Sequence, residues 1–174
     1  MDLWHDLESG SVDNLNVIVE IPRGSQNKYE YDKKTKLFKL DRVLFSPLHY
    51  PGDYGFVPQT LCEDGDPLDA LVLVNHHTFP GMLIHARPIG LLRMIDGGER
   101  DDKILCVPVH DVRFKHVKDV RQLAKPILNE ISHFFQVYKE LEGKKVEIVG
   151  WKSLRITENS IKNSFELYKK EFKK

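Results

Sequence analysis

Residues 63–74 read EDGDPLDALVLV, so that three aspartates lead directly into an apolar segment typical of a buried strand. In an extended chain Asp64 and Asp66 point to the same side with Cα atoms ~7 Å apart, and Pro67 bends the chain so that Asp69 can return there. Two such charges repel by roughly 2 kcal/mol at an effective dielectric constant of about 20. Removing one carboxylate is therefore expected to stabilise the metal-free protein, whereas a bound cation would reverse the repulsion.

The simplest alternative is a solvated turn, because Asp-Gly and Asp-Pro are common turn dipeptides. An EF-hand loop beginning at Asp64 is excluded, since its fifth position needs an oxygen ligand and its sixth a glycine, where Leu68 and Asp69 stand. A haloacid-dehalogenase-like phosphatase needs an apolar strand before the first aspartate, and residues 60–63, TLCE, fit this poorly. Carboxylates without His or Cys favour a hard cation such as Mg²⁺ or Mn²⁺, and Mg²⁺ commonly acts on phosphates.

Length and composition limit the class of protein. The chain has the size of one domain with its own core, and no repeat or linker marks a boundary, so we expect a single domain over residues 1–174. The 26 basic and 26 acidic residues balance, which gives no global field for nucleic acid. Two cysteines, no signal peptide and no apolar run of membrane length predict a soluble cytoplasmic protein without a membrane partner.

Short segments of alternating polarity fill the first two thirds of the chain and predict strands. The element Tyr50 to Gly55, YPGDYG, is instead interpreted as a polar and aromatic turn. The predicted strands cover residues 15–22, 28–32, 37–45, 70–75, 82–94, 103–110 and 145–150.

Two helices are predicted in the last third of the chain. The first begins near Pro126 and ends at Gly143, and the second is capped by Thr157. Their apolar stripes are Ile127, Ile131, Phe134, Tyr138 and Leu141 in the first, and Ile161, Phe165, Tyr168 and Phe172 in the second. Many short strands and two late helices predict an α+β protein, a small closed β-barrel with the helices packed outside.

A second acidic cluster, residues 96–103 or DGGERDDK, joins two predicted strands through a pair of glycines. Alone it would be an ordinary hairpin loop. Basic residues recur beside acidic ones elsewhere, however: Lys28 and Glu30 share a strand face, Arg42 interrupts an apolar run, and Lys103 begins a strand. Carboxylates suited to metals and cations suited to phosphate therefore occur in parallel along the chain.

Together these elements resemble the soluble inorganic pyrophosphatases of family I, in their compact prokaryotic type. The resemblance covers nearly the whole chain, and the Asp-Gly-Asp-Pro-x-Asp of residues 64–69 is the family signature. One departure is Asp53, where members commonly carry Asn. The other matching elements are residues 19–22 (VEIP), 28–30 (KYE), 41–42 (DR), 50–55 (YPGDYG), 96–103, 133–135 (HFF) and 138–139 (YK).

The resemblance implies Mg²⁺-dependent hydrolysis of pyrophosphate to two phosphates, with Mn²⁺ as an alternative ion, on a five-stranded OB-like barrel in a homohexamer. It implies that Asp66 is the general base for a metal-bound water. The implied metal ligands are Asp64, Asp69 and Asp101, with Asp66, Asp96 and Glu30 completing the shells. The implied phosphate-binding residues are Lys28, Arg42, Tyr54, Lys103, Tyr138 and Lys139, and the implied outer shell is Glu20 and Tyr50.

Two other classes of function stay open at this point. An OB-type barrel could bind single-stranded nucleic acid by stacking bases on tyrosines, although the zero net charge and the neighbouring aspartates weigh against it. The tyrosines that would stack the bases are Tyr29, Tyr31, Tyr50 and Tyr54. A Ca²⁺-binding protein without catalytic activity is the other alternative.

Overall fold

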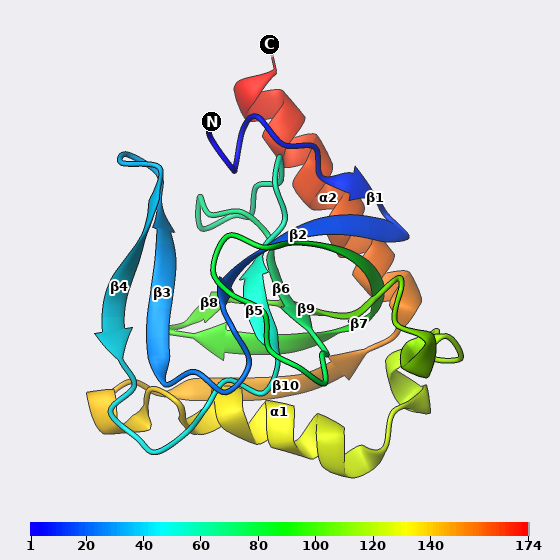
Figure 1. Cartoon of the computed structure of the whole chain (residues 1–174). Coiled ribbons are helices and arrows are strands. Elements are labelled where there is room, and N and C mark those ends of the chain that lie inside the picture. Colours follow the sequence, from blue (N-terminus) through cyan, green and yellow to red (C-terminus); the bar gives the residue numbers. More distant parts are fainter. Residues whose placement is uncertain (174) are drawn as a thin grey trace.

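Five strands close into a ring through their backbone hydrogen bonds. β2 (Asn14–Ile21) pairs with β5 (Asp53–Phe56), which is followed around the ring by β6 (Asp69–Val72), β9 (Lys103–Pro108) and β7 (Leu83–Asp96). β7 then pairs back with β2, and only the pair of β6 and β9 is parallel. The computed structural model, which describes residues 1–173, thus confirms the closed five-stranded barrel (Figure 1).

Further strands extend or flank this barrel. β10 (Val146–Lys152) and the short β8 (Glu99–Arg100) pair with β7, and β1 (Gly10–Ser11) pairs with β2. β3 (Asn27–Asp32) and β4 (Leu37–Val43) form a separate two-stranded sheet, which stands beside the barrel as a hairpin (Figure 1). No strand of the barrel pairs with this hairpin within residues 1–173, so other contacts must hold it in place.

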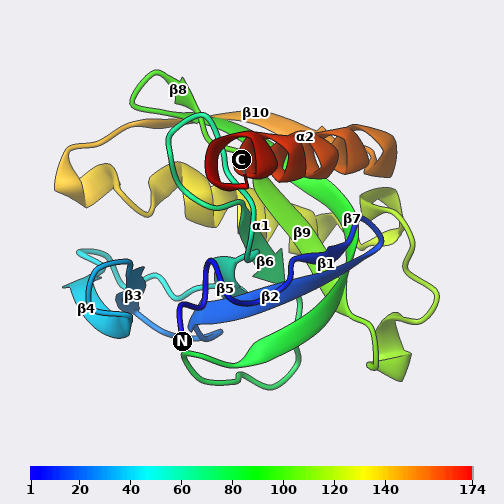
Figure 2. The ribbon, with the colours of Figure 1, turned by 90° about the horizontal axis from the view of Figure 1, so that it is seen from above.

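Two helices cover different sides of the barrel. α1 (Lys125–Val137) packs along β10, and α2 (Leu154–Phe172) packs on β7 (Figures 1 and 2). Short 3-10 helices lie at Val112–Phe114, Val120–Gln122 and Glu140–Glu142. No helix in the described part of the chain is both long and apolar enough to cross a membrane.

Both predicted helices exist, but their details differ from the prediction. α1 ends at Val137, and Ile127 and Leu141 at the two ends of the predicted stripe are exposed. Thr157 does not cap α2, since the helix begins after Ser153. The buried Thr157 hydroxyl instead donates to the Ser153 carbonyl at 3.0 Å, the bond to the carbonyl four residues earlier that threonine makes inside a helix.

Residues 53–56 form the barrel strand β5 rather than part of the predicted turn. All four residues are buried, so the alternation that reveals a half-exposed strand is missing. Gly55 permits the pairing, because a Cβ at this position would lie 1.8 Å from the Ile18 carbonyl oxygen. As a consequence, the side chain of Tyr54 is fixed inside the fold.

Candidate active site

A cavity of about 600 Å³ lies between the β3–β4 hairpin, the barrel and the residues that follow α1. Charged and tyrosine side chains from segments far apart in the sequence line it. The structure therefore brings most of the candidate residues together at one place. Eleven of the fourteen line this cavity: Glu20, Lys28, Glu30, Tyr54, Asp64, Asp66, Asp69, Asp101, Lys103, Tyr138 and Lys139.

Two of the other three, Asp96 and Arg42, are connected to the cavity through its lysines. Asp96, the last residue of β7, accepts a hydrogen bond from Lys139. Arg42 donates from Nη1 to Asp41 Oδ2 at 2.7 Å, and the same oxygen is 3.4 Å from Lys28 Nζ. Asp96 and Arg42 thus border the cavity without lining it.

The loop over residues 60–69 presents its aspartates at the edge of the cavity. Gly65 has a φ of +83°, a conformation that favours glycine, and the backbone N–H of Asp66 donates to Asp64 Oδ1 at 2.9 Å. At the start of the loop, the buried Thr60 hydroxyl accepts a hydrogen bond from the backbone N–H of Leu68 at 2.8 Å. Backbone hydrogen bonds therefore fix the loop independently of any ligand.

Lys103 lies at the centre of the carboxylates. It is 4% exposed, and its Nζ donates to Asp69 Oδ2 at 2.5 Å and to Asp101 Oδ1 at 2.6 Å. Burial by itself lowers the pKa of the Lys103 ammonium. The charge of the facing Asp69 carboxylate, together with that of Asp101, outweighs this effect, so the pKa lies well above its ordinary value. Lys103 is therefore a permanent buried cation.

Two of the carboxyls are held in a crowded, partly dehydrated setting. Burial raises the pKa of Asp64, and the neighbouring charge of Asp66 raises it further. Burial also raises the pKa of Asp101, where Asp69 acts in the same direction and Lys103 opposes it. This region of the cavity consequently favours additional positive charge.

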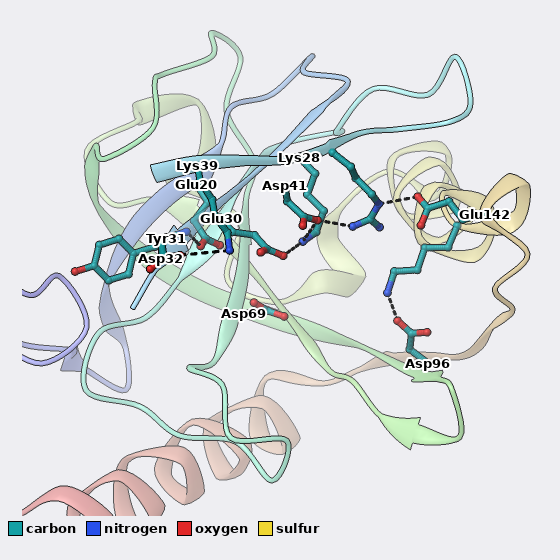
Figure 3. Close-up of polar contacts among 12 residues, drawn as sticks. Glu20, Lys28, Glu30, Tyr31, Asp32, Lys39, Asp41, Asp69, Asp96 and Glu142 are labelled. Atoms are coloured by element: carbon teal, nitrogen blue, oxygen red, sulfur yellow. Dashed lines mark hydrogen bonds and ion pairs between the residues drawn. The ribbon is translucent and has the colours of Figure 1, made fainter. Parts of the chain in front are cut away.

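Glu20, on β2, also lines the cavity and lies beside the β3 residues Glu30 and Tyr31 (Figure 3). Its Oε1 accepts the backbone N–H of Tyr31 at 2.8 Å. The side chain keeps some exposed surface, yet burial of the carboxyl, with the nearby charge of Asp69, raises its pKa to about 8.

This shift predicts a pH dependence for the metal-free protein. Because the folded pKa of Glu20 exceeds its ordinary value of 4.5, its contribution to stability is present at low pH and is lost as pH rises through about 8. The melting temperature measured with a chelator should therefore fall between these two pH values, and Glu20→Gln should flatten the fall. The exposed Glu166 on α2 provides the control, since Glu166→Gln should keep the wild-type slope. An unflattened slope in Glu20→Gln would contradict the assignment.

The tyrosines of the site retain their protons. Burial raises the pKa of Tyr50 and Tyr54 well above the ordinary value, and it also raises the pKa of Tyr138. Tyr50, the third candidate outside the cavity lining, is buried with its ring centroid 5.6 Å from that of Tyr54. The hydroxyls of Tyr54 and Tyr138 are thus available as hydrogen-bond donors to an anion.

Lysines separate the carboxylates from one another. Among residues 1–173 no three carboxyl, imidazole or thiol groups form a ready metal-binding set. Lys103 bridges Asp69 and Asp101, and Lys33 Nζ is 2.5 Å from Asp66 Oδ1. The all-carboxylate donor set nevertheless fits a hard divalent cation, because each of these oxygens already attracts a positive group. A cation could replace the ammonium groups, which would then be free to bind phosphate.

Sequence reasoning missed Lys33. It lines the cavity just after β3, pairs with Asp66, and places its Nζ 4.3 Å from the ring centroid of Trp4. No local pattern distinguishes Lys33 from the adjacent Lys34, since its partners come from distant parts of the chain. The contacts of Arg42 with Glu142 and Asp41, described below, could not be predicted from the sequence either.

Comparison with known proteins agrees with this geometry. A family model described as inorganic pyrophosphatase matches residues 17–169. The chain is 56% identical over 153 residues to the inorganic pyrophosphatase of Synechocystis sp., covering 86% of this chain and 90% of that protein. The chain belongs to the inorganic pyrophosphatase family. The expected family is thereby confirmed.

Other members of the inorganic pyrophosphatase family match over the full length. The Haloferax volcanii enzyme is 47% identical over 175 residues, which cover 99% of each chain. The crystal structure of inorganic pyrophosphatase from Thermus thermophilus has a TM-score of 0.94 at 40% identity and covers 97% of this chain and 99% of that one. The whole barrel, both helices and the hairpin are thus features of the family fold.

Asp53 shows how this inorganic pyrophosphatase accommodates the departure noted in its sequence. The side chain is fully buried. Its Oδ1 accepts the backbone N–H of Arg23 at 2.8 Å, and its Oδ2 accepts the hydroxyl of Thr78 at 2.8 Å. Because both oxygens have donors, the buried carboxylate of Asp53 is satisfied at the position where the resemblance implied asparagine.

Proposed function

We propose that this inorganic pyrophosphatase hydrolyses pyrophosphate to two orthophosphates in the cytoplasm, with Mg²⁺ as its metal. The observation that carries the proposal is the alternation of carboxylates and ammonium groups around one cavity, because the substrate and its metal ions carry opposite charges. The family is metal-dependent, and oxygen ligands of this kind suit Mg²⁺.

The carboxylates at the cavity edge are assigned as metal ligands. Asp64, Asp69 and Asp101 are the principal ligands, because Asp64 lies in the rigid loop, Asp69 begins β6, and Asp101 faces Asp69 across Lys103. Bound cations would lower the pKa of a coordinated water and neutralise charge on the phosphates. The remaining assigned ligands are Asp66, Asp96 and Glu30. Glu20 and Tyr50 are assigned to the outer shell around these ligands.

Asp66 is assigned as the general base. Its side chain is 67% exposed, so it can reach a water inside the cavity. Its Oδ1 accepts from Lys33, whereas its Oδ2 accepts no hydrogen bond from residues 1–173 and can take the proton of the attacking water. The hydrogen bond from its backbone N–H to Asp64 holds the loop in one orientation during this transfer.

The basic residues are assigned to the phosphate oxygens. In the structure, Lys28 pairs with Glu30 and Lys139 pairs with Asp96. Each of these ammonium groups therefore lies beside a proposed metal ligand. When a cation binds that ligand, the ammonium can turn to a phosphate oxygen over a short distance. Fixed cations of this kind stabilise the charge that spreads over the phosphates in the transition state. The full assigned set is Lys28, Arg42, Lys103 and Lys139, with the hydroxyls of Tyr54 and Tyr138.

Phosphate release from pyrophosphate tests the proposal. We expect turnover with Mg²⁺, loss of turnover with excess chelator, and recovery when Mg²⁺ is restored. A parallel series with Mn²⁺ and Ca²⁺ determines which ion supports the reaction. A folded preparation that binds Ca²⁺ or retards a single-stranded oligonucleotide in a salt-dependent way, but releases no phosphate with Mg²⁺, would overturn it.

The single-domain organisation and the homohexamer are further parts of this proposal. They rest on the resemblance of the whole chain to the family. One cooperative melting transition and light scattering, which gives the number of subunits, are the measurements that check them.

A further inference from the structure

Arg42 on β4 is held from two sides. Its Nε donates to Glu142 Oε1 at 2.8 Å, and its Nη1 donates to Asp41 Oδ2 at 2.7 Å (Figure 3). The Arg42 side chain is 23% exposed and that of Glu142 only 7%, so water screens this ion pair weakly. Burial opposes the charge of the guanidinium, but the bonds to Glu142 and Asp41 raise its pKa above the ordinary value.

The guanidinium nevertheless keeps unused donors. Its Nη2 is buried and has no hydrogen-bond partner among residues 1–173. A buried donor without a partner is unfavourable, and the planar fork of arginine matches the oxygens of a phosphate. Arg42 is therefore oriented by its two carboxylates, and its Nη2 is a donor that no residue of the described chain satisfies.

Glu142 belongs to a segment that also carries two phosphate-binding candidates. Tyr138 and Lys139 follow α1 directly, and Glu142 ends the 3-10 helix that comes next. The backbone N–H of Lys144 donates to the Lys139 carbonyl at 3.1 Å, which closes this segment into a compact turn. Glu142 and Lys139 are consequently held at a fixed spacing.

The pair of Arg42 and Glu142 connects two parts of the cavity wall that lie 100 residues apart in the sequence. The β3–β4 hairpin carries Arg42 and Lys28, and the segment after α1 carries Lys139. The hairpin does not pair with the barrel strands, and the hydrogen bond between Arg42 and Glu142 is a side-chain contact that joins it to that segment. A buried, charge-assisted hydrogen bond is suited to this task.

We infer that Glu142 is a positioning residue for pyrophosphate: it orients Arg42 and fixes the β3–β4 hairpin at the right distance from Lys139. This inference rests on the proposed function, since it concerns the binding of the same substrate. Glu142 does not line the cavity and is not one of the assigned metal ligands. Its effect on catalysis therefore passes through Arg42.

A double-mutant cycle tests this role. Glu142→Gln keeps the shape of the side chain and removes its charge, and Arg42→Ala removes the group through which it acts. We expect Glu142→Gln to lower kcat/KM for pyrophosphate by about tenfold, mainly through KM, as for the loss of one charge-assisted hydrogen bond. In the Arg42→Ala background the same substitution should change kcat/KM by less than about twofold, because coupled residues are not additive.

Glu140→Gln is the matched control. Glu140 lies on the same 3-10 helix but is exposed, so its substitution should leave kcat and KM unchanged. If Glu142→Gln folds poorly, as judged by its melting temperature, Glu142→Met replaces it as a similarly shaped residue without charge. The inference is overturned by an unchanged KM in a Glu142 variant, or by equal losses in both Arg42 backgrounds. A wild-type protein that releases no phosphate contradicts the proposed function instead.

Discussion

Asp69→Asn is expected to lower kcat/KM for pyrophosphate by at least about 100-fold at saturating Mg²⁺. Asp69 begins β6 and projects into the cavity, where its Oδ2 lies 2.5 Å from the buried Lys103 Nζ. An amide is a weaker metal ligand than a carboxylate and cannot compensate the charge of Lys103. Phosphate release measured over a range of Mg²⁺ concentrations should show both a lower maximum and a higher Mg²⁺ requirement.

The same substitution should destabilise the metal-free protein by about 1–2 kcal/mol, which thermal melting with a chelator measures. Repulsion among the aspartates alone predicted stabilisation, but the structure reverses the sign because Lys103 is paired with Asp69. Asp13→Asn is the control, since Asp13 is exposed between β1 and β2 and should affect neither property. Activity near that of the wild type would remove Asp69 from the set of metal ligands.

Lys103→Met is expected to produce the second large effect. The substitution removes a buried cation and leaves Asp69 and Asp101 facing each other without compensation. Stability without metal should fall by about 3–5 kcal/mol, as for other buried pairs that lose one partner. Loss of a phosphate-binding group should also lower kcat/KM by at least about 100-fold.

Mg²⁺ should restore part of the lost stability in Lys103→Met, because a divalent cation can compensate the two carboxylates. The measurement is the melting temperature with chelator and with Mg²⁺, in the variant and in the wild type. Lys162→Met serves as the control, since Lys162 is exposed on α2. If Mg²⁺ raises the melting temperature of the variant no more than that of the wild type, the carboxylates around Lys103 do not form the metal site.

Local signals in the sequence predicted much of the site, because turn chemistry acts within a few residues. Gly65 adopts the positive φ expected of a turn glycine, and the aspartates on either side of it are presented together at the mouth of β6. The alternation of polar and apolar residues predicted the strands that have one solvated face. It missed β5, because all residues of this strand are buried. The prediction of a cap at Thr157 failed because a threonine hydroxyl can also donate to a backbone carbonyl inside a helix, as Thr157 does to Ser153.

By itself, the sequence determined both helices, most of the longer strands, the aspartate-rich loop and the membership of a family whose signature spans only six residues. Only the tertiary structure decided which cation faces which carboxylate: Lys103 with Asp69, Lys33 with Asp66, and Arg42 with Glu142. The physical reason is that backbone conformation depends on neighbouring residues, whereas charge interactions depend on distance and burial, which the closed barrel and its hairpin set.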